Sequence, residues 1–353
     1  MFKILSINPG STSTKIAVYN DDKLQFSHTI RHSSEELSIY KSVFEQYNFR
    51  KELILRTLEK EQISLADFRA IVGRGGLMKP LQSGVYEVCS EMIEDMKSGR
   101  EHASNLGAML AREIADGIGN CKAFIADPVV VDELQDVARI SGLPQFPRRS
   151  VFHALNHKAI ARKYAKSIGS NYEKLNLVIA HLGGGISVAA HRKGKVIDTN
   201  QALDGFGSFS PERAGTIDAG ALIQMCFSGE YSREQIHKML VGKGGLVAHL
   251  GTNDAREVTI RATSGDTHAK LILEAMAYNV CKEIGAMIAV LAGNVHAVIL
   301  TGGIAYNIFV VNYIKDFIAP LAHLVVYPGE DEMEALAFAG LRVLRGEQAR
   351  QYN

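Results

Sequence analysis

The fold is decided by residues 2–30, FKILSINPGSTSTKIAVYNDDKLQFSHTI, together with residues 175–199, LNLVIAHLGGGISVAAHRKGKVIDT. Each stretch contains an apolar β-rich run, a loop of small residues, a second strand, a polar turn and a third strand. The expected strands are Phe2–Asn8, Thr14–Tyr19 and Lys23–Ile30, then Leu175–Ala180, Ile186–His191 and Lys195–Thr199. The two copies start a domain length apart, so duplication of one α/β unit explains them better than a short structural repeat.

Helical and strand patterns follow each copy, which predicts an α/β protein. Further strands are expected at Ala70–Val72, Ala123–Ala126, Val295–Leu300 and His323–Tyr327. Helices are expected at His102–Ile118, Thr216–Phe227, Ser232–Val241, Thr267–Ala292, Ala305–Ala319 and Asp331–Arg345, and Ser33–Glu36 resembles a capping box that opens another. We expect one domain over residues 1–150, completed by the C-terminal helix at 331–353, and a second over 151–330. Without a low-complexity linker, the two halves are expected to touch closely around a cleft.

Composition narrows the class of protein. The 353 residues suggest about two domains. Lys and Arg total 39 against 38 Asp and Glu, and this net charge of +1 argues against nucleic acid or a membrane surface as the main partner. The four cysteines form no CxxC pair, and no signal-peptide pattern precedes the first strand, so a cytoplasmic location is expected.

One uncharged run, Ile284 to Ile314, could be interpreted as a membrane span. Gly293-Asn294, His296 and Thr301-Gly302-Gly303 divide it into short pieces. A buried helix end, a buried strand, a loop and a new helix fit these interruptions better.

Three loops have the composition of phosphate-binding sites. Asn8–Lys15 combines small residues with the hydroxyls of Ser11 and Ser13 and the charge of Lys15, although an ordinary hairpin turn is the simpler alternative. It lacks the spacing of a Walker loop. The run Gly183-Gly184-Gly185 permits close approach of a ligand, and Thr301-Gly302-Gly303-Ile304-Ala305 joins a strand to a helix N-terminus. Flexible hairpin and helix-packing glycines are the alternatives for these two loops.

Together these motifs resemble those of the acetate and butyrate kinases, the acetokinase family of the actin and hexokinase superfamily. The segments that carry the resemblance run in order through nearly the whole chain: 2–15, Asp127-Pro128, Phe152–Lys158, His181–Gly185, Arg213–Asp218, Thr301–Asn307 and Pro328–Glu332. The resemblance implies two RNase H-like domains with a nucleotide in the cleft between them. It also implies reversible transfer of a phosphoryl group from ATP to a short-chain fatty acid. The amino-acid sequences of the first two loops are similar to those of the butyrate kinase branch.

Charged candidates follow from this resemblance. Arg74 and Arg213 are expected to neutralise the carboxylate and the phosphoryl group, because a guanidinium donates two parallel hydrogen bonds to either anion. A fatty acid is already ionised at neutral pH, so Asp127 is expected to orient the phosphoryl group, its magnesium or a water rather than to act as a base. A helix N-cap is the structural alternative for Asp127.

Histidines are the next candidates. His153 and His181 are expected to donate hydrogen bonds to the transferred phosphoryl group. His157 lies one helical turn after His153, and a structural role is the stronger alternative for it. Direct in-line transfer is favoured over a phosphoenzyme, because a loose transition state needs positioning and charge more than covalent help.

The resemblance assigns the remaining ligand contacts. ATP or ADP is expected to bind with Mg²⁺, for which Asn8 and Glu332 are the candidates, partly through water, with Asp331 as a substitute for Glu332. The nucleoside candidates are Asp254, Arg256, Gly302, Gly303, Ile304 and Asn307. Phe152 and Gly75 are assigned to the acyl pocket, where the missing side chain after Arg74 would leave room for a longer acid.

The expected partners are therefore a short-chain fatty acid or acyl phosphate, with a homodimer or larger homo-oligomer formed through the second domain. Kinases for acetate, propionate or a branched acid are the nearest alternatives. A sugar kinase or a non-catalytic actin-like ATPase is more remote. A sugar kinase would need a polar hydroxyl-binding cluster near Arg74, and an actin-like ATPase would carry large insertions; neither is evident.

Overall fold

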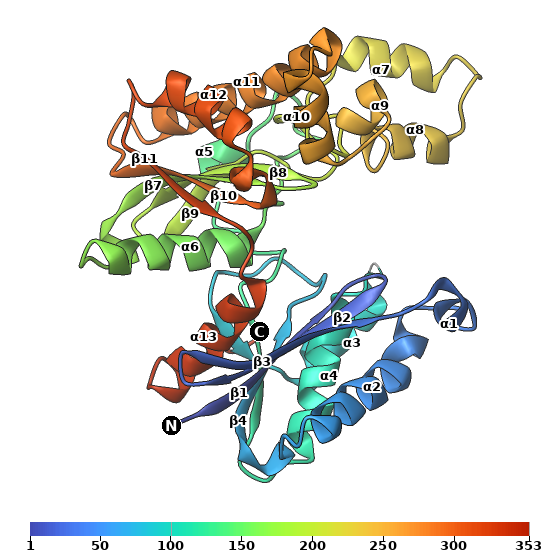
Figure 1. Ribbon diagram of the computed structural model, residues 1–353, viewed down its shortest axis with the longest axis vertical. Helices are drawn as coiled ribbons and strands as arrows, with labels where there is room; N and C mark the ends of the chain where they lie inside the picture. The colour runs from blue at the N-terminus through green and yellow to red at the C-terminus, as the bar shows by residue number, and fades with distance from the viewer. Residues whose placement is uncertain (100, 353) are drawn as a thin grey trace. The chain divides into compact units, whose positions relative to one another are not determined.

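The computed structural model describes residues 1–99 and 101–352. The chain divides into two compact units, drawn in Figure 1. Unit 1 comprises Met1–Val131, Ala154–Asn156 and the C-terminal segment from Asp331, and unit 2 comprises Asp132–His153 and His157–Glu330.

Unit 1 is built on a mixed sheet with the strand order β3-β2-β1-β4-β6-β5. Its strands are β1 (Lys3–Pro9), β2 (Ser13–Asn20), β3 (Lys23–Arg31), β4 (Phe68–Arg74), β5 (Val85–Glu87) and β6 (Lys122–Ala126). Helix α4 (Asn105–Asp116) covers one face, with α2 (Tyr47–Lys60) and α3 (Ser90–Ser98) beside it, and α13 (Glu332–Leu344) covers the other. The alternation of β1 explains both layers: Ile7 belongs to the core shared with α4, whereas Ile4 faces Gly340 of α13.

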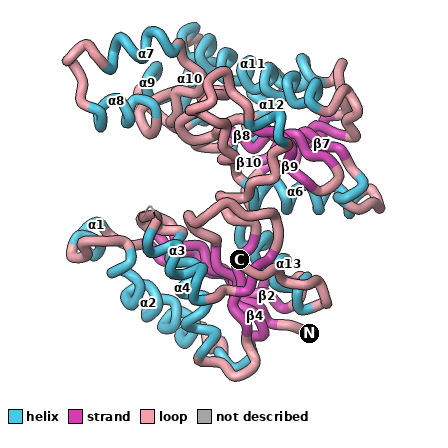
Figure 2. Tube along the Cα trace, turned by 180° about the vertical axis from the view of Figure 1, so that it is seen from behind, coloured by secondary structure: helices cyan, strands magenta, loops and turns pink. Residues whose placement is uncertain are grey.

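Unit 2 repeats this plan with the strand order β11-β10-β7-β8-β9. Its strands are β7 (Asn176–Leu182), β8 (Ile186–Arg192), β9 (Lys195–Thr199), β10 (Ala297–Gly302) and β11 (Leu324–Pro328). Helices α11 (Thr267–Val290) and α12 (Ile308–Ile318) lie on one face of the sheet and α6 (Ala154–Ser167) on the other, as Figures 1 and 2 show. Helix α10 (Ala255–Thr263) packs on α11.

The two sheets share one topology. In each, the first three strands form an antiparallel meander and the next strand pairs in parallel with the first. A further parallel strand follows beyond it, β6 in unit 1 and β11 in unit 2, and β5 is an additional edge strand of unit 1. The duplicated α/β architecture expected from the sequence is confirmed.

Short elements complete the chain. They are α1 (Ser34–Ser38), α5 (Asp136–Arg139), α7 (Ala219–Cys226), α8 (Arg233–Leu240) and α9 (Leu246–Leu250), with 3₁₀ turns at Phe44–Gln46, Leu65–Asp67, Tyr172–Lys174 and Gly303–Tyr306. The capping box of α1 is confirmed, since Ser33 accepts from the Glu36 amide and the Glu36 side chain accepts from the Ser33 amide. The uncharged run is divided between α11, β10, a 3₁₀ turn and α12, and none of the described helices is long and apolar enough to cross a membrane.

The expected helix at Ala305 begins instead at Ile308. Gly302 has a φ of +90°, and a 3₁₀ turn follows it before the helix starts. The Asn307 side chain then accepts from the amides of Phe309 and Val310, which fixes the N-terminus of α12 there.

The chain passes from unit 1 to unit 2 after Val131, earlier than the boundary expected at residue 150. Residues from Asp132 onward belong with unit 2, because Glu133 accepts from the Val196 amide and from Lys158, and Arg148 pairs with Asp198 at 2.7 Å. These bonds attach the segment before α6 to β9.

Candidate active site

The loop between β1 and β2 is held by a residue that sequence reasoning missed. The guanidinium of Arg50, from α2, is fully buried and donates to the carbonyl oxygens of Gly10 (2.8 Å), Ser11 (3.1 Å) and Ser13 (3.1 Å). Burial lowers the pKa of Arg50 to about 10, so it remains charged at neutral pH. Because three loop carbonyls turn toward Arg50, the loop has a fixed shape, and Ser11 and Lys15 lie exposed.

Asn8, Arg74 and Glu332 meet in unit 1. Asn8 Nδ2 donates to Glu332 Oε2 at 2.5 Å, and Arg74 Nη1 donates to the same oxygen at 3.1 Å. Asn8 and Arg74 end neighbouring parallel strands, and Glu332 begins α13. The Ser6 hydroxyl also donates to the Met333 carbonyl at 3.0 Å, which ties the start of α13 to β1. The sequence-predicted anion-binding arginine and both magnesium candidates are thus in contact.

Asp127 lies at the end of β6 in a strained conformation, with a φ of +37°. Its buried Oδ1 accepts from the Ser83 hydroxyl at 2.6 Å and from the Gly84 amide at 2.9 Å. The alternative of a helix N-cap is wrong, because a turn rather than a helix follows Pro128. The carboxylate is instead held by the loop that precedes β5.

In unit 2, the glycine loop after β7 is shaped around two charged side chains. His181 Nε2 lies 3.0 Å from Glu330 Oε1. A Cβ on Gly183 would lie 3.1 Å from that same carboxylate oxygen, and a Cβ on Gly185 would lie 1.7 Å from Arg213 Nη1. A side chain at Gly185 would therefore displace the Arg213 guanidinium, and one at Gly183 would press on the Glu330 carboxylate.

Arg213 is held in place by backbone. Its Nη1 donates to the carbonyl oxygen of Ala202, and the Ser210 hydroxyl from the same loop donates to the Gly184 carbonyl at 2.7 Å. Burial lowers the pKa of Arg213, while the nearby carboxylate of Glu212 raises it. Glu212 also accepts from Asn253 at 2.5 Å, which links this loop to the segment before α10.

His153 and His181 come together in the same unit. Their rings are stacked with centroids 3.9 Å apart and planes 18° from parallel. His153 is half-buried at the N-terminus of α6, and its Nδ1 lies 2.8 Å from the Ser187 hydroxyl of β8.

The nucleoside candidates form a third group. Asp254 caps α10, accepting from the Arg256 amide at 2.8 Å, and this hydrogen bond is the main reason why the pKa of Asp254 is lowered. Asn307 Nδ2 donates to the Ala255 carbonyl (3.3 Å) and to the Thr259 hydroxyl (2.7 Å), so the start of α12 lies against α10. Gly303 is open, with nothing within 4 Å of a Cβ built on it.

The magnesium candidates suit an ion that keeps most of its water. Within the part of the chain that the structure describes, no three His, Cys, Asp or Glu side chains cluster as a metal cage. Mg²⁺ needs only one or two carboxylates when phosphate oxygens and waters complete its octahedron. The partly exposed Glu332 carboxylate beside Asn8 fits that requirement.

The acyl-pocket expectation for Gly75 meets a steric obstacle. A Cβ built on Gly75 would lie 2.5 Å from the Pro128 Cβ and 3.2 Å from its Cα. Gly75 therefore packs directly on the turn that follows Asp127, and its missing side chain does not open a space there. Phe152 is buried, with its ring edge-to-face against His157 at 5.3 Å.

Comparison with known proteins identifies the family. The family model described as "Acetokinase family" matches residues 145–348. Butyrate kinase 2 and butyrate kinase 1 of Clostridium acetobutylicum are 52% and 53% identical to this chain, covering 99% and 100% of both sequences respectively. The chain belongs to the acetokinase family.

Solved structures agree on the fold of this acetokinase. Acetate kinase of Porphyromonas gingivalis matches 98% of this chain and 100% of its own with a TM-score of 0.80 at 18% identity. A propionate kinase of Francisella tularensis matches 96% of this chain and 98% of its own with a TM-score of 0.75 at 22% identity.

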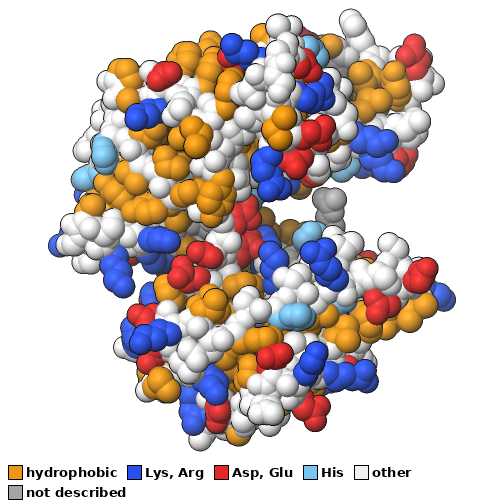
Figure 3. All heavy atoms as spheres, in the orientation of Figure 1, with side chains coloured by type: hydrophobic (Ala, Val, Ile, Leu, Met, Phe, Trp, Pro, Cys, Tyr) orange, Lys and Arg blue, Asp and Glu red, His pale blue; other side chains and the backbone are white. Residues whose placement is uncertain are grey.

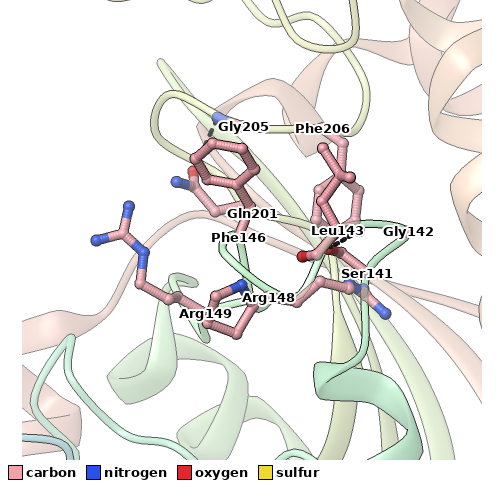
Figure 4. Close-up of a pocket in the computed structure, with 10 residues that line it drawn as sticks. Ser141, Gly142, Leu143, Phe146, Arg148, Arg149, Gln201, Gly205 and Phe206 are labelled. Atoms are coloured by element: carbon pink, nitrogen blue, oxygen red, sulfur yellow. Dashed lines mark hydrogen bonds between the residues drawn. The ribbon is translucent and has the colours of Figure 1, made fainter.

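A cavity of about 450 Å³ in unit 2 adjoins the loop that holds Arg213. It lies between the segments 141–149 and 201–206, and Figure 4 shows Phe146 and Phe206 beside it, with Arg149 extending away. Gln201 and Gly205 line both this cavity and a smaller one that contains Arg213. A ligand there would touch the loop whose Ala202 carbonyl holds Arg213.

Proposed function

We propose that this acetokinase catalyses the reversible phosphorylation of butyrate by ATP, giving butyryl phosphate and ADP. The observation that carries the proposal is the full-length identity of 52% and 53% to two butyrate kinases. The residues of both units are consistent with it, since each unit presents an arginine and a group of polar side chains suited to anionic substrates.

Charge neutralisation is the main requirement of the reaction. A carboxylate and a terminal phosphate repel each other, and Arg74 and Arg213 supply positive charge and directed donors for them. Arg74 is oriented by Glu332 and Asn8, and Arg213 by the Ala202 carbonyl. The carboxylate needs no general base, and Oδ1 of Asp127 is already engaged by Ser83 and Gly84, so we assign Asp127 to orientation.

Transfer is proposed to be direct and in line. His153 and His181 would donate to the equatorial oxygens of the moving phosphoryl group, where negative charge is shared in the transition state. Ser11, Ser13, Lys15 and the glycines 183–185 would hold the nucleotide phosphates, and Asp254, Arg256, Asn307 and Gly302–Ile304 the nucleoside. Mg²⁺, held by Glu332 and Asn8 partly through water, would neutralise phosphate oxygens.

The test is a hydroxamate assay with ATP, Mg²⁺, hydroxylamine and a panel of acids from acetate to valerate, including isobutyrate. Two extra buried methylenes favour butyrate over acetate by about 1.6 kcal/mol, or roughly 15-fold in kcat/KM. A higher kcat/KM for acetate, propionate or isobutyrate would establish one of the alternative acid kinases. Absence of any acyl hydroxamate would reject the proposal.

The arginines provide the second arm of that test. Arg74→Ala and Arg213→Ala are each expected to lower kcat by roughly 100- to 1,000-fold while the protein stays folded. Arg69→Ala is the matched control, because Arg69 is exposed on the same strand as Arg74. Retention of more than about a tenth of the wild-type rate in both variants would contradict these assignments.

We also propose that the enzyme is a homo-oligomer formed through unit 2. Helix α7 contains no buried residue, and Ile223 (59%) and Phe227 (87%) are strongly exposed; Figure 3 shows hydrophobic side chains over this region. Exposed apolar faces of this kind are typical of protein interfaces. Ile223→Glu should lower the mass measured by sedimentation, whereas Ile260→Glu, at an exposed isoleucine of α10, should not; equal masses would exclude α7 as the interface.

A further inference from the structure

A continuous chain of hydrogen bonds runs from the core of unit 2 to His153. The Tyr172 hydroxyl lies 2.6 Å from His191 Nδ1, and His191 Nε2 lies 3.2 Å from His157 Nδ1. His157 Nε2 lies 2.9 Å from the Ser187 hydroxyl, which lies 2.8 Å from His153 Nδ1. The four links join the 3₁₀ turn at Tyr172, strand β8 and helix α6.

The interior members of this chain are buried and neutral. Ser187, His157 and His191 have no exposed surface, and Tyr172 is 2% exposed. Burial lowers the pKa of both His157 and His191 well below the usual value. Nearby positive charge lowers both further, from His181 and Lys158 for His157 and from His157 and Lys158 for His191. Each of these two imidazoles therefore has one donor nitrogen and one acceptor nitrogen.

This constraint leaves only two arrangements of protons. Either every donor points toward His153, or every donor points toward Tyr172. Each neutral imidazole has one donor and one acceptor nitrogen, and the single proton of the fully buried Ser187 hydroxyl goes to His153 Nδ1 when His157 Nε2 carries a proton and to His157 Nε2 when it does not. If Ser187 accepted from both rings, its own proton would be buried with neither of these acceptors. In the first arrangement Ser187 donates to His153 Nδ1, so a neutral His153 carries its proton on Nε2. In the second, His153 Nδ1 carries the proton and Nε2 is a bare acceptor.

The charges around Tyr172 favour the arrangement directed toward His153. The cations of Lys158 and Arg162 lie 5.5 and 5.9 Å from the centre of the Tyr172 ring, and they stabilise the negative end of the chain's dipole at that end.

We propose that Tyr172, His191, His157 and Ser187 are positioning residues that hold His153 in its Nε2–H tautomer. This inference rests on the proposed function, in which His153 donates to the transferred phosphoryl group. A bare Nε2 would repel that anion, whereas Nε2–H stabilises it. His157, for which a structural role was the expected alternative, acts through His153 and does not touch the substrate.

The first experiment needs no substrate. Two-bond ¹H–¹⁵N spectra of the uniformly ¹⁵N-labelled enzyme at pH 7.5, with His153→Gln for assignment, report which ring nitrogen of His153 carries the proton. The expected result is the Nε2–H form in the wild type. An Nδ1–H form in the folded wild type would overturn the proposal, whether or not the enzyme phosphorylates butyrate.

The second experiment removes the donor at the far end. Tyr172→Phe should increase the Nδ1–H fraction of His153 and lower kcat by about tenfold, less than the roughly 100- to 1,000-fold loss from removing a donor altogether. The KM for ATP should change less than twofold. Tyr164→Phe is the matched control, because Tyr164 is a buried tyrosine of the same core outside the chain of hydrogen bonds.

These outcomes separate the inference from the proposed function. An active Tyr172→Phe enzyme with wild-type kcat and an unchanged His153 spectrum would overturn the inference and leave the function standing. An inactive wild type would reject the function, while the His153 spectrum would still decide the tautomer. If Tyr172→Phe does not fold, Ser187→Ala with Ser187→Thr as the variant that keeps the hydroxyl tests the same link.

Discussion

At the scale of single residues, Arg50 is expected to hold the shape of the loop between β1 and β2. Arg50→Met removes donors from three loop carbonyls, from Thr14 Oγ1 and from Gln46 Oε1. The Ser13 carbonyl keeps the Gly10 amide and Thr14 keeps His32, whereas Gly10, Ser11 and Gln46 lose a donor. Loss of a partner at a buried acceptor costs about 1–3 kcal/mol, so the free energy of unfolding should fall by roughly that amount. Urea denaturation measures this loss, and the KM for ATP should rise because the loop loses its shape.

Arg56→Met is the control for that prediction. Arg56 lies on the same helix, is exposed, and among the described residues forms an ion pair with Glu52, four residues earlier, at 3.3 Å. Such exposed pairs contribute less than about 1 kcal/mol. If both variants unfold at the same urea concentration and bind ATP alike, Arg50 does not determine the loop.

A second prediction at this scale concerns Gly185. In Gly185→Ala the new methyl would overlap Arg213 Nη1, the mobile end of a long side chain, so the guanidinium should move while the fold survives. We expect kcat to fall toward that of Arg213→Ala with little change in Tm. Combining the two substitutions should then add little, because both remove the same interaction.

Gly285→Ala is the matched control for this substitution. Nothing lies within 4 Å of a Cβ on Gly285, in the middle of α11, and alanine favours a helix. Additive losses in Gly185→Ala with Arg213→Ala would show that Gly185 acts on something other than Arg213.

At the scale of elements, the strands other than the short edge strand β5 were predicted, because their signals are local. Apolar runs, small-residue loops and polar turns alternate within a few residues of one another, and β1–β3 and β7–β9 appear within one or two residues of the expected bounds. Helices α2, α3 and α10 were not predicted. The buried residues of α2 include the charged Arg50, so this helix lacks a purely apolar face. The helix expected at Ala305 was displaced because Asn307 caps α12 through its side chain.

Site residues, too, could be predicted only where their signals are local in the sequence. Arg74, Asn8 and Glu332 could be proposed from motifs, and the structure brings them together. Arg50 could not be found from the sequence, because its partners in the β1–β2 loop lie 36–40 positions earlier in the chain and no local pattern records them. His191 occupies an ordinary inward position of a strand, so only the three-dimensional contact with Tyr172 and His157 distinguishes it from a core residue.

The prediction at the scale of elements concerns the loop after β4. Gly75 is packed on Pro128, so Gly75→Ala should shift the turn that carries Asp127 and lower kcat/KM for all acids alike. A pocket-wall role would instead change the ratio of kcat/KM between butyrate and acetate. The hydroxamate assay with both acids separates these results, and a changed ratio with unchanged activity toward acetate would restore the pocket assignment.

At the scale of the whole molecule, buried neutral histidines link stability to pH. Burial and the nearby charge of Arg50 lower the pKa of His32 in unit 1 from 6.5 to about 4, and burial lowers those of His157 and His191 in unit 2. The unfolded chain therefore binds more protons than the folded one between about pH 6.5 and 4. The stability is complete above pH 6.5 and decreases as the pH falls through that window.

His32 should account for roughly 3 kcal/mol of this loss, at about 1.4 kcal/mol for each pKa unit. About 2 kcal/mol of this loss falls between pH 7.5 and 5.0. Urea unfolding at pH 7.5, 6.0 and 5.0 measures that part, with fluorescence and circular dichroism compared because two units need not unfold together. His32→Gln removes the titrating ring and should flatten the dependence, at the cost of a lower stability at pH 7.5. His28→Gln, at an exposed position of β3, which ends one residue before His32, should keep the wild-type slope. Equal slopes in the two variants would mean that the acid sensitivity arises elsewhere than in His32.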